Sequence, residues 1–167
     1  AFIAALPSRA LQAQHIADSS FAALVARLSE SGGFFDSDNI ISNEASYLQI
    51  HSQLIKQGVR GGAYIGVGPD QNFSYIALIR PSIAFMLDIR RDNMLEHLLF
   101  KSLFELSHNR FEYLCLLFGK PVPADVSAWT GRQLGLIIAY LNQTPTDSQA
   151  VAATRKASNA RITKLGL

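Results

Sequence analysis

One stretch, from Ala63 to Arg91, constrains the fold of this chain more than any other. It reads AYIGVGPDQNFSYIALIRPSIAFMLDIRR. The pattern predicts an apolar strand, a glycine turn, a short helix over 72–79 that ends before Pro81, and a second apolar strand over 83–89 that closes with an acid. That order is typical of a Rossmann-type βαβ unit, in which an adenosine-containing ligand lies where the first strand turns into the helix.

Three residues of this unit are candidates for contact with such a ligand. Gly66 and Gly68 fall where the strand meets the helix, and a side chain at either position would keep the backbone away from a ligand. The alternative is that both glycines only serve a tight turn. Asp88 follows Gly68 by twenty positions, and its carboxylate could accept hydrogen bonds from both ribose hydroxyls. Asp88 could equally cap the following helix together with Asp92.

The turn departs from the dinucleotide-binding fingerprint at its third position. Gln71 stands where that pattern has a glycine or alanine. Pro69 suits the first turn of a helix but has no amide to offer a pyrophosphate, and Asp70 adds a negative charge beside it. We therefore expect a ligand with a nucleoside but no phosphate. S-adenosylmethionine is the common cellular ligand of that kind.

A basic pair after the second strand leaves another cofactor open. Arg90 and Arg91 stand where a 2′-phosphate would be held, which would indicate NADP in place of S-adenosylmethionine. Asp88 would repel that phosphate, and solvated charges at the start of a helix explain the pair as well.

Residues 62 to 91 resemble the first motifs of class I S-adenosylmethionine-dependent methyltransferases, namely a strand that ends in GxG and an acid that closes the next strand. The resemblance implies a Rossmann-like fold that binds the methyl donor at the GVG turn and Asp88. Residues 33–121 also resemble an uncharacterised bacterial family of longer proteins, in the SNEASYL segment and the GVGPDQNFSYIA turn. No assigned chemistry comes with that second resemblance.

Two further candidate ligand-binding residues, Asn43 and Glu44, begin a predicted helix before the first strand. Glu44 could hold the amino group of the ligand or act as a base, or it could be an acid that the helix dipole favours. Asp36 and Asp38 form a loose acidic set with Glu44, but their spacing matches no metal loop, so no metal site is expected. The catalytic residues stay unknown, and the chain holds no GxSxG, phosphate-binding lysine loop or CxxC motif.

The composition indicates that apolar surface is covered by a partner. Hydrophobic residues make up 49% of the chain and charged residues only 17%, which is few for a monomer. We therefore expect a homo-oligomer or a larger complex. A net charge of only +2 implies no strong field that would attract nucleic acid, so no nucleic-acid partner is expected. No apolar run is long enough for a transmembrane segment. The alternative function is a non-catalytic Rossmann-like binding or assembly subunit.

The predicted fold class is α/β: a partial Rossmann-like (methyltransferase-like) domain, helix-rich, with few parallel strands and a helical C-terminal half. The predicted parts are an N-terminal segment (1–17), a Rossmann-like βαβ core (18–121) and a helical extension (122–167). A complete domain of this class needs more strands than the two that are evident. The chain is therefore either part of a larger Rossmann domain or a small, largely helical domain with a two-stranded element.

Further helices are expected after the second strand, since apolar residues recur at helical spacing there. The expected ranges are 92–106, 110–118, 129–141 and 147–165. Cys115, the only cysteine, lies in an apolar run and is predicted to be a buried structural thiol.

The first ten residues, AFIAALPSRA, are similar to the end of a signal-peptide apolar region, with Ser8-Arg9-Ala10 as a cleavage site. The alternatives are a sequence that starts inside a longer gene and an amphipathic helix that runs into Ile16. Export would place the protein in the periplasm. A methyltransferase would be cytoplasmic, because S-adenosylmethionine is a cytoplasmic metabolite.

Overall fold

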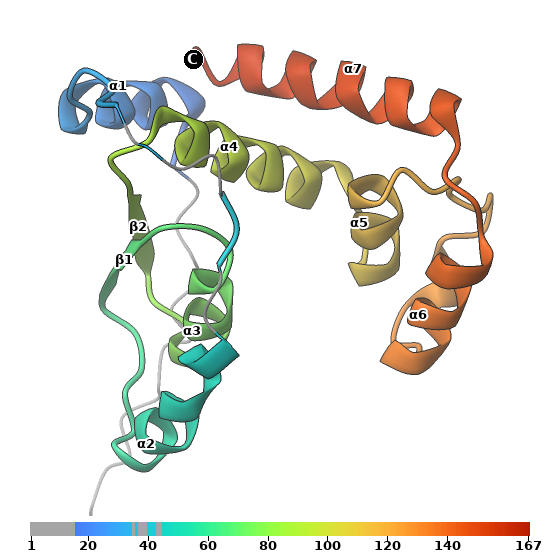
Figure 1. Cartoon of the computed structure of the whole chain (residues 1–167), viewed down its shortest axis with the longest axis horizontal. Helices are drawn as coiled ribbons and strands as arrows, with labels where there is room; N and C mark the ends of the chain where they lie inside the picture. Colours follow the sequence, from blue (N-terminus) through green and yellow to red (C-terminus); the bar gives the residue numbers. More distant parts are fainter. Residues whose placement is uncertain (1–15, 35, 37–39, 43–44) are drawn as a thin grey trace, which may run out of the picture. The chain divides into compact units, whose positions relative to one another are not determined.

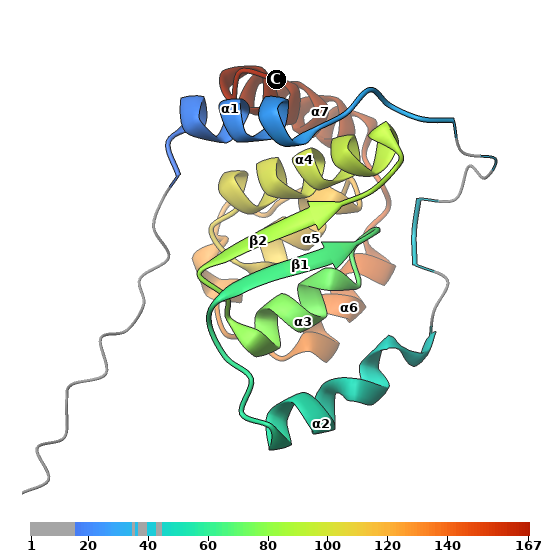
Figure 2. The same cartoon turned by 90° about the vertical axis from the view of Figure 1, so that its left-hand side faces the viewer.

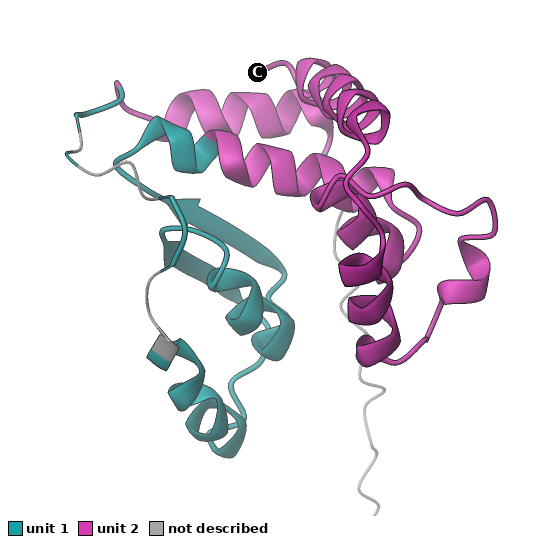
Figure 3. Ribbon diagram, turned by 45° about the vertical axis from the view of Figure 1, so that its right-hand side comes forward, with its two compact units in different colours: residues 1–16, 32–94 teal, residues 17–31, 95–167 magenta. Residues whose placement is uncertain are grey.

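The computed structural model describes residues 16–34, 36, 40–42 and 45–167. This part of the chain forms two compact units (Figure 3). The first unit includes residues 32–94, and the second combines residues 17–31 with residues 95–167. The predicted site residues Asn43 and Glu44 lie outside the described residues.

The first unit is a small α/β arrangement built around two parallel strands (Figure 2). Its elements are η1 (Ala45–Ile50), α2 (His51–Lys56), β1 (Ala63–Val67), α3 (Asn72–Ile79) and β2 (Ile83–Leu87). The two strands run in register from Ala63 opposite Ile83 to Val67 opposite Leu87. Helix α3 connects them and lies against one side of the sheet (Figure 1). The expectation of a helix-rich α/β chain with few parallel strands is confirmed.

The end of α3 follows from the proline that comes after it. Arg80 adopts a left-handed conformation with φ 53°, because the position before Pro81 disfavours the right-handed helical region. The chain then turns directly into β2, and the Ser82 amide donates to the Gly62 carbonyl over 2.8 Å. The predicted helix over 72–79 is confirmed residue for residue. The second strand was predicted to reach Ile89 but ends at Leu87.

One face of the two-stranded sheet is open to solvent. Apolar strands of a parallel sheet are expected to be covered on both faces, yet Ile65 is 68% exposed and Val67 69% exposed. Leu87, opposite Val67 in the register, is 48% exposed, and Ile89, two residues after the end of β2, is 61% exposed. Among the described residues, helical cover is thus found on one face only. We call Ile65, Val67, Leu87 and Ile89 the open sheet face.

The second unit consists of helices. They are α1 (Asp18–Leu28), α4 (Arg91–Leu106), which begins in the first unit, α5 (Arg110–Leu117), η2 (Ser127–Trp129), α6 (Leu134–Gln143) and α7 (Ser148–Lys164). Its core is formed by Phe111, Cys115 and Ile137, all fully buried. The ring of Phe111 stacks on that of Trp129, with 3.9 Å between centroids and planes 7° apart. The ring of Tyr140 meets both edge-on.

Most of the helices of this unit were predicted to within a residue or two, but α6 was not. The expected range began at Trp129, whereas α6 begins at Leu134. Trp129 lies instead in the short η2 turn, where stacking on Phe111 holds it. Gly131 then takes a left-handed conformation with φ +74°, which no regular right-handed helix contains. The packing of Trp129 on Phe111 therefore keeps this residue out of the helix that the sequence pattern predicted.

An ion-pair network joins three helices that are far apart in the sequence. Arg161 of α7 donates two hydrogen bonds of 3.0 Å to the carboxylate of Asp18 in α1. It also pairs with Glu105 of α4, which binds Lys101 as well. Burial opposes ionisation of Glu105, but the hydrogen bonds from Lys101 and Arg161 outweigh it and hold the pKa of Glu105 below its ordinary value. Within the described part of the chain, no helix has both the length and the apolar character to cross a bilayer.

Candidate functional site

The structure brings Gly68 and Asp88 together at the carboxyl ends of the two strands. Gly68 directly follows β1, and its amide donates to the carbonyl of Leu87, the last residue of β2, over 3.0 Å. A Cβ atom at Gly68 would lie 3.9 Å from Oδ2 of Asp88. Gly68 is buried with φ +81°, a conformation that favours glycine, whereas Asp88 is exposed.

The Asp88 carboxylate is held in place through one of its oxygens. Oδ1 accepts a hydrogen bond of 2.8 Å from the Arg90 amide, which leaves Oδ2 on the side of Gly68. Among the described residues, no basic side chain forms an ion pair with Asp88. The loop after β2 thus presents an exposed, oriented acceptor beside a position without a side chain.

Gly66 does not face this edge freely, because a side chain of α3 occupies the space beside it. A Cβ atom at Gly66 would lie 2.7 Å from Cγ of Asn72 and 2.7 Å from Cε1 of Tyr64, and closer still to Oδ1 of Asn72. Gly66 is therefore needed for packing inside the turn. Of the two glycines, only Gly68 lies next to Asp88.

Asn72 is the residue of this region that the sequence analysis missed. Its side chain, 2% exposed, donates to the carbonyls of Val67, Gly68 and Pro69 over 3.1, 3.1 and 2.8 Å. Its Oδ1 accepts a bond of 2.7 Å from the Tyr64 hydroxyl. An amide side chain at the start of an apolar helix was the available signal, but its three acceptors become visible only in three dimensions.

An aromatic cluster joins residues of η1, α2, β1 and α3. Tyr75 contacts the rings of Tyr47, His51 and Tyr64, with centroids 6.4, 5.9 and 6.5 Å away. Its hydroxyl donates to the Tyr47 carbonyl over 2.7 Å. Burial, together with the neighbouring Tyr75, raises the pKa of Tyr64. These contacts fix the helix whose first residues shape the turn.

The basic pair that left NADP open occupies two different environments. Arg90 is 9% exposed, and its guanidinium lies 3.4 Å from the carboxylate of Asp92. Arg91 is exposed. Asp92 lies inside the first turn of α4 and does not precede it as a cap. A 2′-phosphate at Arg90 would therefore meet a guanidinium that already has an acidic neighbour.

The acidic residues of the N-terminal region cannot be assembled into a site. Asp36 is exposed, while Asp38 and Glu44 lie outside the described residues. In the described ranges, no group of three His, Cys, Asp or Glu residues could hold a metal ion.

The remaining reactive side chains have local structural roles. Cys115 is fully buried, as predicted, and burial together with the nearby Glu112 raises the pKa of its thiol to about 11. A protonated, buried thiol is a poor nucleophile. His108 precedes α5, and its Nδ1 lies 2.8 Å from Oε2 of Glu112.

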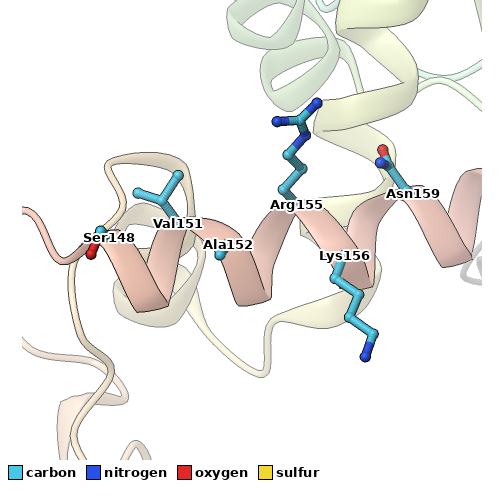
Figure 4. Close-up of a pocket in the computed structure, with 6 residues that line it drawn as sticks. All are labelled: Ser148, Val151, Ala152, Arg155, Lys156 and Asn159. Carbon is cyan, nitrogen blue, oxygen red and sulfur yellow. The ribbon is translucent and has the colours of Figure 1, made fainter.

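Two depressions occur in the second unit, and neither brings together side chains that would serve a common chemical function. The first, of about 500 Å³, is lined by α7 alone (Figure 4): Ser148, Val151, Ala152, Arg155, Lys156 and Asn159. Arg155 and Lys156 point to different sides of the helix. The second, of about 350 Å³, lies between α5 and α7 and carries the small side chains Ala150, Ala153 and Ala157. The edge at Gly68 and Asp88 therefore remains the candidate site.

Comparisons with known proteins identify one relationship. No curated protein matches the chain. No solved structure matches it either. Residues 39–128, more than half of the chain, match the profile of a family described as a domain of unknown function, DUF7790. This range contains β1, α3 and β2 and thus the whole candidate site. The chain belongs to the DUF7790 family.

Proposed function

We propose that this protein binds a nucleoside at the edge formed by Gly68 and Asp88, as an S-adenosylmethionine-dependent methyltransferase-like protein. The observation that carries the proposal is the position of an exposed acid beside a buried glycine at the carboxyl ends of two parallel strands. Ligands of open α/β sheets bind outside the carboxyl ends of the strands.

The geometry suits a ribose. The free oxygen of Asp88 lies on the side of Gly68, where only hydrogen atoms stand on the α-carbon and the nearest side-chain atom is Nε2 of Gln71, 3.4 Å from the position of a Cβ atom. A ribose could thus approach the backbone closely while its hydroxyls donate to the carboxylate. Bound S-adenosylmethionine would supply a methyl group on a sulfonium, and the protein would act mainly by placing that group in line with an acceptor.

Calorimetry of the 167-residue chain with S-adenosylhomocysteine and S-adenosylmethionine tests this proposal. We expect micromolar dissociation constants, which correspond to about −8 kcal/mol. Asp88→Ala should weaken binding by about 1.5–3 kcal/mol, because it removes a charged acceptor. The affinity of Asp88→Asn, which keeps one acceptor oxygen, should fall between those of the wild-type chain and Asp88→Ala.

Asp125→Ala is the matched control. It removes one exposed carboxylate from the other unit, where Asp125 accepts a bond from Ser127, and it should leave affinity unchanged. The absence of measurable heat from the wild-type chain at high ligand concentration would exclude the nucleoside site. An equal loss in Asp88→Ala and Asp125→Ala would show that only net charge matters.

The second candidate function, a non-catalytic assembly subunit, is favoured by the open sheet face. Ile65, Val67 and Leu87 form uncharged surface on strands whose outer edges carry no lysine or proline. Such surfaces and edges are normally covered or protected. A contact that covers them in a stable complex should bury more than about 1,000 Å².

Sedimentation at micromolar concentration measures whether a second copy provides this cover. The wild-type chain should sediment as a homo-oligomer, and Ile65→Glu should shift it toward the monomer because a charge enters the open sheet face. Ile55→Glu, at a side chain of similar exposure on α2 (64%), should leave the oligomer intact. A folded, monomeric wild-type chain would contradict the proposed self-association.

A further inference from the structure

The start of α3 is arranged differently from a helix start that binds phosphate. Phosphate sites at helix N-termini depend on backbone amides that have no partner within the protein. Here the amides of Asn72, Phe73 and Ser74 donate to the carbonyls three residues before them, over 3.5, 2.9 and 3.1 Å. Pro69 contributes no amide at all. Of residues 69–74, that leaves the amides of Asp70 and Gln71 for an anion, and the carboxylate of Asp70 stands beside them.

Two amide side chains complete this arrangement. The Asn72 side chain draws the carbonyls of the turn toward its own amide group, in the space beside Gly66. Gln71 folds back in the same way, and its Nε2 donates to the Val67 carbonyl over 3.2 Å. That nitrogen would lie 3.4 Å from a Cβ atom at Gly68. The protein thus supplies its own donors where a phosphate-binding loop leaves room for the ligand.

We propose that Asn72 is a specificity-determining residue that restricts the Gly66–Gly68 turn to nucleosides without a 5′-phosphate. It acts as a positioning residue, because its bonds to the carbonyls of residues 67–69 hold the turn in the conformation in which the amides of residues 72–74 are already bonded. Asp70, exposed at the same helix start, adds charge repulsion against a phosphate. A 5′-thioether or sulfonium needs no donors at this point. The inference rests on the proposed nucleoside site.

Calorimetry with adenosine and AMP on the 167-residue chain tests it, since the two probes differ only in the 5′-phosphate. The wild-type chain should bind adenosine at least tenfold more tightly than AMP. Asn72→Ala should reduce that ratio to threefold or less, because the turn can then rearrange and release amides to the phosphate. Asn72→Ser, which keeps a single donor, gives a second measurement of the ratio in a less altered turn.

Tyr64→Phe is the matched control, since it removes the hydrogen bond to Oδ1 of Asn72 but leaves the three bonds from Nδ2. This variant should keep the wild-type ratio even if it melts at a lower temperature. A role of Asn72 in stability alone would lower the melting temperature without changing the ratio.

The outcomes separate the two proposals. Binding of AMP within threefold of adenosine by the wild-type chain would overturn the restriction. A wild-type ratio in both folded Asn72 variants would overturn the assignment to Asn72 while leaving the nucleoside site. No binding of adenosine, AMP or S-adenosylhomocysteine would overturn the proposed function, and the inference with it.

Discussion

Replacement of Gly66 by alanine is expected to lower the free energy of unfolding by about 2–4 kcal/mol, from overpacking and the loss of Asn72 hydrogen bonds. The new methyl group would lie 2.7 Å from both Cγ of Asn72 and Cε1 of Tyr64. Asn72 would then have to leave the position from which it bonds three carbonyls. Hydrogen exchange of the β1 and β2 amides measures the effect where it arises.

Two controls make this expectation specific. In an Asn72→Ala background the same Gly66→Ala change should cost much less, because its main obstacle is gone. Gly135→Ala in α6, where a Cβ atom would meet nothing within 4 Å, should instead raise stability, by up to about 1 kcal/mol. Equal costs of Gly66→Ala in the two backgrounds would show that Asn72 is not the obstacle.

Replacement of Phe111 by alanine is expected to lower the free energy of unfolding of the second unit by about 3–5 kcal/mol. Phe111 is fully buried, stacks on Trp129 and touches Tyr140 at the ring edge. The cavity left behind cannot be filled without moving η2 or α6. Chemical denaturation followed by the fluorescence of Trp129, the only tryptophan, reports on this core directly.

Phe118→Ala is the comparison for that result. Phe118 ends α5 but is 54% exposed, so its loss should cost about 1 kcal/mol or less. The native fluorescence of Trp129 should also change in Phe111→Ala and stay constant in Phe118→Ala. Similar costs for the two variants would mean that the aromatic stack does not carry the stability of this unit.

Local signals in the sequence predicted most of the elements. Helix α3 is enclosed between a glycine turn and Pro81, so both of its ends were predictable. The start of α7 follows from Asp147, whose Oδ1 accepts from the Gln149 amide over 2.9 Å. The neighbourhood of Gly68 and Asp88 was also predictable, because consecutive parallel strands place their carboxyl ends at one edge of a sheet.

Features that depend on distant contacts could not be predicted. The helical spacing of apolar residues after Trp129 correctly predicted a helix, but the predicted start at Trp129 was wrong. The ring of Trp129 stacks on Phe111, and α6 begins only at Leu134. The role of Asn72 requires the backbone geometry of the turn. The expected cover of both sheet faces is absent among the described residues, where Ile65 and Val67 stay exposed. Nucleoside binding and self-association remain predictions for the experiments above.

The ion pair between Asp18 and Arg161 also bears on how the protein is made. A ribosome releases α1 before the rest of its unit: the partner of Asp18 lies 143 residues later, and residues 32–94 form a separate unit in between. Contacts between residues so far apart in the sequence are slow to form, because a long loop must be closed first. The β1–α3–β2 segment is continuous in sequence, so its contacts form without the closure of a long loop. Translation order therefore favours a nascent chain in which the candidate site exists before the helices of the second unit have joined.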